Sequence, residues 1–315
     1  MRAKVVAVYR LLYGSDFIAE SLASVTDASD AVLCFVGRRP FGGRPSVRYF
    51  GHEVFFPHDV DGVADTIRAW AAEHDPAGKV RVIDNPHDAV LKNQLGRLVD
   101  EFVIPHHDAT HVLQVEGDEV WHADALSALL NAAETSDADE IMSTNDLFWR
   151  SPRFVSRRNN PYAVLRAIKG ARTIGPTGNA LMSTRDDLVR LAPPGVRVHN
   201  FGYACSERTM FWKHLAGLSF SRDLRWDSVP REDWFEAVWR TWNWHTNRRT
   251  DLCPSVGYPD AFAAAEIYPE HDLPRVIRDR IARDPLPEWH AAERQPASAE
   301  PVSAEPKPDL IEGAA

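Results

Sequence analysis

Short apolar runs alternate with helix-like stretches through the first 135 residues, and this alternation restricts the fold more than any other feature. Four apolar runs have the length and composition of buried strands: residues 5–8, 31–36, 79–83 and 111–115. Each run is followed by a stretch whose apolar residues recur at helical spacing: 18–25, 60–71, 90–102 and 125–133. Such alternation produces right-handed crossover units. The sequence therefore predicts an α/β fold with a doubly wound, mainly parallel sheet.

The rest of the chain predicts a second half and a tail. A chain of 315 residues fits one large domain or two small ones. We expect residues 1–135 to form the α/β half and residues 136–284 to form a second half with a tryptophan-rich, helical C-terminal extension. The helical spacing of Trp234, Trp239 and Trp242 favours core packing, with stacking on sugar rings as the alternative. Residues 285–315 are dominated by Pro, Ala, Glu and Ser, which predicts a disordered tail.

Composition excludes several classes of function. The formal charge of −9, from 36 basic and 45 acidic residues, gives no electrostatic footprint for nucleic acid. No apolar run approaches the ~20 residues that span a bilayer, and the N-terminal run is too short for a signal peptide. The three cysteines are odd in number and have no metal-type spacing, which is typical of reduced thiols. We therefore expect a cytoplasmic protein without a membrane span.

An acidic cluster directly follows the fourth apolar run. Residues 111–115 lead into Glu116, Gly117, Asp118 and Glu119. In open α/β sheets, ligands bind beyond the carboxyl ends of the strands. Glu116 and Asp118 are two positions apart, so in an extended chain their side chains leave on the same side, where they repel unless a cation lies between them. The pattern predicts a Mg²⁺ or Mn²⁺ site, and a solvated acidic loop is the alternative.

These residues together resemble the family 2 type of glycosyltransferase, which has the nucleotide-sugar-binding type A fold. The resemblance covers roughly residues 4–215, and its acidic signature corresponds to residues 116–121. A downstream segment, His199-Asn200-Phe201-Gly202-Tyr203-Ala204 with Met210 and Lys213 after it, resembles a His-Phe-Gly-Tyr segment of some members. Three features depart from the pattern: Glu116 stands where the family has Asp, a basic loop with Arg38 and Arg39 follows the second run, and the downstream His falls one residue early, with Asn200 at its expected place. The base of the nucleotide is therefore left open.

The resemblance implies an activity and its cofactor. It implies a metal-dependent transfer of a sugar from a nucleoside diphosphate sugar to an acceptor, with inversion at the anomeric carbon. Residues 1–135 would then be the nucleotide-sugar-binding half, and residues 136–284 the acceptor-side half of the same catalytic domain. Mn²⁺ or Mg²⁺ would bridge the diphosphate and neutralise the leaving group as a Lewis acid. The acceptor and the donor sugar are not implied.

The resemblance also assigns roles to individual residues. The implied metal ligands are Glu116, Asp118 and His199, although Asn200 is a competitor of His199 because adjacent strand residues point to opposite sides. The implied catalytic residues are Asp118 and Glu207, with Glu207 as general base and Asp186 and Asp187 as competitors. The implied donor-binding residues are Ala7, Val8, Tyr9, Lys92, Asn93 and Glu116.

Three other classes remain open at the level of sequence. A nucleotidyltransferase would share the sheet and the carboxylate pair, but it would usually carry a glycine-rich, basic loop after the first strand. The corresponding loop here, residues 9–14, has one glycine. A metal hydrolase could use the residues before the fourth run, which are His106, His107, Asp108 and His111. A non-catalytic sugar- or nucleotide-binding protein would keep the fold without the metal site, and Glu116 in place of Asp is compatible with it.

Overall fold

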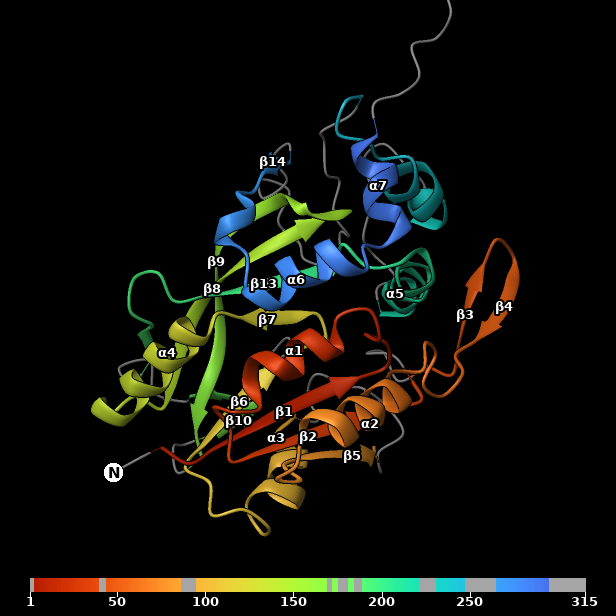
Figure 1. The fold of residues 1–315 in the computed structure, drawn as a ribbon. Helices are drawn as coiled ribbons and strands as arrows, with labels where there is room; N and C mark the ends of the chain where they lie inside the picture. Colours follow the sequence, from red (N-terminus) through yellow and green to blue (C-terminus); the bar gives the residue numbers. More distant parts are fainter. Residues whose placement is uncertain are drawn as a thin grey trace, which may run out of the picture.

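The computed structural model describes residues 3–39, 44–85, 95–168, 172–174, 181–183, 189–220, 231–246 and 265–294. Within these residues, ten strands form one central sheet with helices packed against it (Figure 1). Eight of the strands follow the order β5-β2-β1-β6-β9-β8-β13-β7, while β12 pairs with β8 and β14 pairs with β9. The predicted α/β class and the helical C-terminal region are confirmed.

The four strands of the sheet's first half are all parallel. They are β1 (Val5–Leu11), β2 (Ala31–Val36), β5 (Val80–Asp84) and β6 (His111–Val115). β1 lies between β2 and β6, with Val8 opposite Leu33 on one side and Gln114 on the other. β1 extends to Leu11, three residues beyond the predicted run. Its side chains are buried on both faces, as in parallel sheets that helices cover on both sides.

Alternate residues of β1 pack against different helices, which is the double winding that the sequence predicts. Val5, Ala7 and Tyr9 belong to a core with α1 (Ile18–Val25), α2 (Val63–His74) and α4 (Ala123–Thr135). Val6 and Val8 belong to a second core, under α3 (Leu95–Leu98) and the π-helical turn η2 (Val99–Val103). The period of two along the strand therefore divides its side chains between two helical layers.

The second half of the sheet is mixed. The long strands β8 (Glu140–Trp149) and β9 (Ser151–Ala167) pair antiparallel, and β9 also pairs antiparallel with β6. β13 (Arg197–Tyr203) runs parallel to β8 and antiparallel to β7 (Glu119–Trp121). Short strands complete this half: β12 (Val189–Leu191) and β14 (Glu266–Ile267). The acidic cluster lies in the connection from β6 to β7, and β7 pairs with β13. The cluster therefore links the two halves of the sheet.

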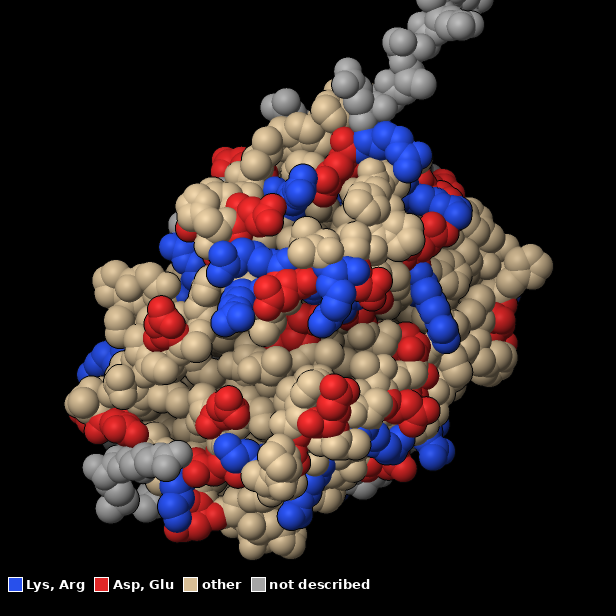
Figure 2. Space-filling model, viewed as in Figure 1, with Lys and Arg blue, Asp and Glu red and all other residues tan. Residues whose placement is uncertain are grey.

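Two small hairpins lie outside the main sheet. One pairs β3 (Ser46–Tyr49) with β4 (His52–Phe55) and projects from the body of the molecule beside α5 (Glu207–Phe220) in Figure 1. The other pairs β10 (Arg172–Ile174) with β11 (Leu181–Ser183). Basic and acidic side chains are interspersed over the face in Figure 2, and basic ones gather over α6 (Arg275–Arg283). No helix among the described residues is long and apolar enough to cross a membrane.

The tryptophans of the C-terminal region form a core of their own. Trp234, Trp239 and Trp242 are all buried, in and beside the π-helical segment η5 (Phe235–Arg240), which confirms the core-packing interpretation. Two 3₁₀ turns belong to the same region, η4 (Arg231–Asp233) and η8 (Glu270–Asp272). The indole of Trp239 donates to the carbonyl oxygen of Tyr203 at 3.0 Å, which ties this core to the end of β13.

The predicted boundary of the disordered tail is wrong. Helix α7 (Pro287–Glu293) lies within the stretch 285–315 that composition assigned to disorder. Its Trp289 is buried, stacks on Phe17 with ring centroids 5.9 Å apart, and donates its indole N–H to the carbonyl oxygen of Ala204 at 2.7 Å. Trp289 gives this short helix its aromatic packing contact and a hydrogen bond to the body of the protein. The average composition of residues 285–315 does not reveal such a single residue.

Candidate active site

The switch point of this sheet lies at the carboxyl ends of β1 and β6, and we call this position the crevice. After β1 the chain continues to β2, on one side of β1 in the sheet. After β6 it continues to the other half of the sheet, so the direction of the strand order reverses between β1 and β6. Ligands of open α/β folds bind at such a switch point. The two loops touch there: a Cβ atom on Gly117 would lie 2.9 Å from Leu11 Cδ2, and one on Gly14 would lie 3.5 Å from Gly117 Cα. Only glycine at position 117 permits this approach without displacing Leu11.

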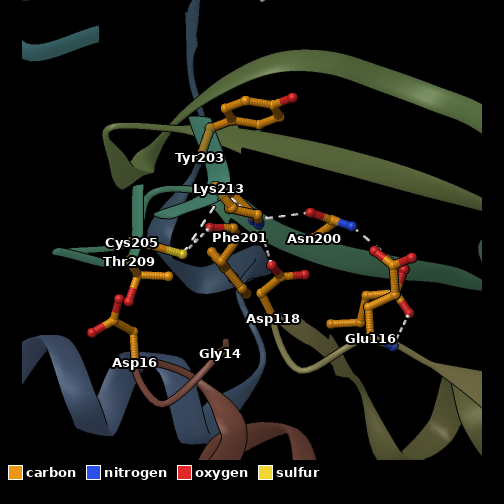
Figure 3. Close-up of polar contacts among 12 residues, drawn as sticks. Gly14, Asp16, Glu116, Asp118, Asn200, Phe201, Tyr203, Cys205, Thr209 and Lys213 are labelled. Atoms are coloured by element: carbon orange, nitrogen blue, oxygen red, sulfur yellow. Dashed lines mark hydrogen bonds and ion pairs between the residues drawn. The ribbon is translucent and has the colours of Figure 1, made fainter. Parts of the chain in front are cut away.

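The acidic cluster forms a closed turn at this crevice. The N–H of Glu119 donates to the carbonyl oxygen of Glu116 at 3.0 Å, and the N–H of Glu116 donates back to Oε2 of Glu119 at 2.9 Å. The carbonyl oxygen of Asp118 accepts from the N–H of Phe201 on β13 at 2.8 Å. These three bonds fix the backbone of the turn, so the side chain of Asp118 has a defined direction (Figure 3).

Glu119 has a structural role in this turn. It is fully buried, and its Oε1 accepts from Nδ2 of Asn200 at 3.4 Å. Burial, together with the neighbouring Glu116 charge, raises the pKa of Glu119 well above its ordinary value. Both carboxyl oxygens of Glu119 are thus used within the turn and by β13.

Asp118 forms an ion pair with a lysine that sequence analysis assigned no role. Oδ2 of Asp118 accepts from Nζ of Lys213 at 2.5 Å, and Nζ also donates to the carbonyl oxygen of Gly202 at 2.7 Å (Figure 3). Asp118 is 6% exposed, and its other oxygen, Oδ1, is buried and has no hydrogen-bond partner in the described part of the chain. Burial opposes the charged form of Lys213, but Asp118 and other nearby groups outweigh it and raise the pKa of Lys213 well above its ordinary value.

Gly202 makes room for this arrangement. A Cβ atom at position 202 would lie 2.8 Å from Nζ of Lys213 and 2.8 Å from Oδ1 of Asn200. That amide oxygen accepts from the N–H of Gly202 at 2.9 Å, which holds the Asn200 side chain over the turn. In the sequence, this arrangement corresponds to the segment from Asn200 to Gly202, followed by Lys213 on the next helix.

Aromatic rings flank the ammonium group of Lys213. Nζ lies 5.6 Å from the ring centroid of Tyr13 and 5.7 Å from that of Tyr203, within the range of cation–π attraction. Burial raises the pKa of the Tyr13 phenol, so this ring stays neutral. Cys205 lies nearby, and its thiol donates to the carbonyl oxygen of Phe201 at 3.5 Å. Burial raises the pKa of Cys205 well above its ordinary value, which makes this thiol a poor nucleophile.

Carboxylates brace the loop after β1. Oδ2 of Asp61 accepts from the N–H groups of Gly14 at 2.7 Å and Ser15 at 3.0 Å, and from the hydroxyl of Thr209 on α5 at 3.3 Å. Oδ2 of Asp16 accepts from the N–H of Ser206 at 2.8 Å. The amide groups of Gly14 and Ser15 are thus used by a carboxylate. This loop differs from the phosphate cradle that a nucleotidyltransferase would have after its first strand.

The structure does not bring the three predicted metal ligands together. His199 lies on β13 beside Asn200, but it is fully buried and its Nε2 is 2.9 Å from the hydroxyl of Tyr268. Burial, with the nearby His122, lowers the pKa of His199 to about 3. Asn200, the competitor of His199, is the residue that faces the acidic turn (Figure 3). Among the described residues, no three His, Cys, Asp or Glu side chains are grouped so that they could hold a metal ion.

The other predicted site residues have separate positions. Glu207 is the first residue of α5, and its carboxylate is 2.5 Å from Nη2 of Arg240. Ala7, Val8 and Tyr9 are fully buried in the middle of β1. In the loop after β1, Tyr13 and Gly14 lie at the crevice. Lys92, Asn93, Asp186 and Asp187 lie outside the described residues. The histidines of the hydrolase alternative precede or begin β6, at the opposite end of this strand from Asp118.

Comparisons with known proteins add only weak likenesses of fold. No family model and no curated protein matches the chain. The similar solved structures include residues 1–349 of TarS from S. aureus, with a TM-score of 0.38 and 10% identity over 74% of this chain and 69% of that chain. They also include a 4-diphosphocytidyl-2C-methyl-D-erythritol synthase, with a TM-score of 0.30 and 14% identity over 53% of this chain and 76% of that chain.

Proposed function

We propose that this protein is a glycosyltransferase that moves a sugar from a nucleoside diphosphate sugar to an acceptor. The observation that carries the proposal is the position of Asp118. It is a buried carboxylate at the switch point of the sheet, it is paired with Lys213, and one of its oxygens has no hydrogen-bond partner among the residues that the structure describes. A buried polar atom without a partner is costly, so its presence in a crevice favours a ligand that would satisfy it.

The chemistry of the crevice supports a diphosphate as part of that ligand. An anionic group needs donors and a cation, and Lys213 supplies both at this edge of the sheet. The rings of Tyr13 and Tyr203 provide flat apolar surfaces near the ammonium. Transfer requires that the charge developing on the leaving diphosphate be stabilised, and preorganised charges in a dry crevice are the most effective means.

The chain's residues also fit the divalent ion that the family resemblance implies. Mg²⁺ is usually held by one or two carboxylates together with substrate phosphates, and it rarely needs a complete cage of protein ligands. Oδ1 of Asp118 would be one such ligand and Glu116, in the same turn, the second. When bound, the ion would supply Lewis-acid stabilisation of the leaving diphosphate. His199 is not part of this proposed set.

Glu207 completes the proposal as the general base for the acceptor. Inversion requires a group that removes the acceptor proton. The Glu207 side chain is 42% exposed, so an acceptor can reach it, and its carboxylate forms an ion pair with Arg240. Arg240 also pairs with Glu236, which provides a matched control for mutation.

The proposal is tested by thermal denaturation in the presence of UDP, GDP, CDP and dTDP, with Mn²⁺ or with chelator. A ligand that binds only the folded state raises its melting temperature. We expect one nucleotide to produce a shift with Mn²⁺ in the wild type, and we expect Asp118→Ala to reduce it. If no nucleotide changes the melting temperature in either condition, the proposal is wrong.

A further inference from the structure

The ammonium group of Lys213 is a cation already built into the crevice. Its side chain is 18% exposed and that of Asp118 is 9% exposed, so the lysine keeps the larger exposed fraction of the two. We propose that Lys213 binds the diphosphate of the donor directly, as a resident cation that acts without a divalent ion. This inference rests on the proposed function and names a specific binding residue for it.

The hydrogen bonds of Lys213 leave capacity for a ligand. An ammonium group has three N–H donors. In the described part of the chain, Nζ of Lys213 contacts Oδ2 of Asp118 and the carbonyl oxygen of Gly202. One donor direction therefore remains for a phosphate oxygen. The ammonium also lies within about 6 Å of two tyrosine ring centroids, so cation–π attraction adds to its two hydrogen bonds.

The charges of the crevice make such a cation necessary. Asp118 and the neighbouring Glu116 would repel a diphosphate that approached them without a counter-charge. Lys213 offsets the charge of Asp118 before any ligand arrives, because the two atoms are in hydrogen-bond contact. A divalent ion on Oδ1 of Asp118 would add to this neutralisation, since Lys213 occupies the other oxygen.

Helix α5 holds Lys213 in a fixed position relative to both loops of the crevice. Ser206, directly before the helix, donates hydrogen bonds to Asp16 in the loop after β1. Thr209, in the first turn of the helix, donates to Asp61, which binds the same loop through Gly14 and Ser15. Lys213 itself is bound to the turn after β6 through Asp118. The cation is thus preorganised, and donor binding would pay little to order it.

The test measures binding of the same nucleoside diphosphates, and of inorganic pyrophosphate, to the full chain in chelator. We expect the nucleotide that binds with Mn²⁺ to bind the wild type in chelator as well. Lys213→Met should weaken this chelator-resistant binding about tenfold or more, because it removes a charge-assisted hydrogen bond, and Lys213→Arg should retain part of it. Lys4→Met is the matched control, because Lys4 forms a similar pair with Asp108, at 2.6 Å, away from the crevice.

A second pair of variants keeps the test valid if Lys213→Met folds poorly. Asp118→Asn leaves the lysine in place, so it should keep chelator-resistant binding while it loses any added effect of Mn²⁺. The double variant Lys213→Met/Asp118→Asn removes both charges and should lose both kinds of binding. Binding that requires Mn²⁺ in the wild type would overturn the inference and leave the proposed function intact. No binding in either condition would overturn both.

Discussion

The parallel strands β1 and β6 have a lysine–aspartate pair at each end, and the two pairs differ in almost everything but their contact distance. Lys4 and Asp108 are 2.6 Å apart before the strands begin, and their side chains are 51% and 94% exposed. Lys213 and Asp118 are 2.5 Å apart beyond the carboxyl ends, and they are 18% and 9% exposed. An exposed pair contributes little to stability, whereas a buried one is retained only if its surroundings satisfy it. The two pairs therefore differ in burial, and the buried pair lies at the end of the sheet where we propose the active site.

The largest expected difference between the two ends is in catalysis. Asp118→Asn should lower donor turnover about a thousandfold, because it removes a fixed charge from the site where the leaving group is stabilised. Asp108→Asn should leave turnover unchanged. Steady-state rates of nucleoside diphosphate release from the preferred donor provide the measurement. Equal rates for the two variants would remove the distinction between the two ends of the sheet.

The second difference is in stability. Lys213→Met should reduce the free energy of unfolding by about 3 kcal/mol, because it leaves the buried Asp118 carboxylate without its counter-charge. Lys4→Met should change it by less than about 1 kcal/mol. Urea denaturation of both variants measures these values. The double variant Lys213→Met/Asp118→Asn should recover part of the loss, and a double variant less stable than Lys213→Met would contradict the pairing.

A third comparison uses two glutamates that form ion pairs with the same arginine. Arg240 contacts both Glu207 and Glu236. If Glu207 is the general base, Glu207→Gln should lower kcat about a hundredfold with little change in donor binding. Glu236→Gln, which disturbs the same arginine, should retain nearly full activity. If Glu207→Gln and Glu236→Gln have the same kcat, Glu207 is not the general base.

The smallest expected effect concerns pH and the histidine beside the site. Burial lowers the pKa of His199 to about 3, so the unfolded chain binds a proton there at pH values where the folded chain does not. The resulting loss of stability begins as the pH falls below about 6.5 and grows by at most about 1.4 kcal/mol per pH unit. His199→Gln should flatten this part of the stability profile between pH 6.5 and 5. An unchanged profile would mean that His199 is not buried in its neutral form.

Much of the fold and one part of the site follow from local sequence. The strand predictions succeed because apolar runs such as 31–36 depend only on neighbouring residues, and the position of Asp118 follows from the rule for strand ends. Lys213 could not be found this way, since 95 positions separate it from Asp118. Sequence alone also could not choose between His199 and Asn200, because the register of β13 against β7 decides which of them faces the turn. The tail prediction failed because a composition average conceals Trp289.

We propose that the crevice of Asp118 and Lys213 transfers sugars and does not merely bind nucleotides. This is tested by incubating the protein with a panel of nucleoside diphosphate sugars and following release of the free nucleoside diphosphate by chromatography. We expect the wild type to consume one donor, by transfer or by slow hydrolysis, and Asp118→Asn to consume none. A nucleotide that binds while every donor in the panel stays intact would contradict the claim and favour a non-catalytic binding protein.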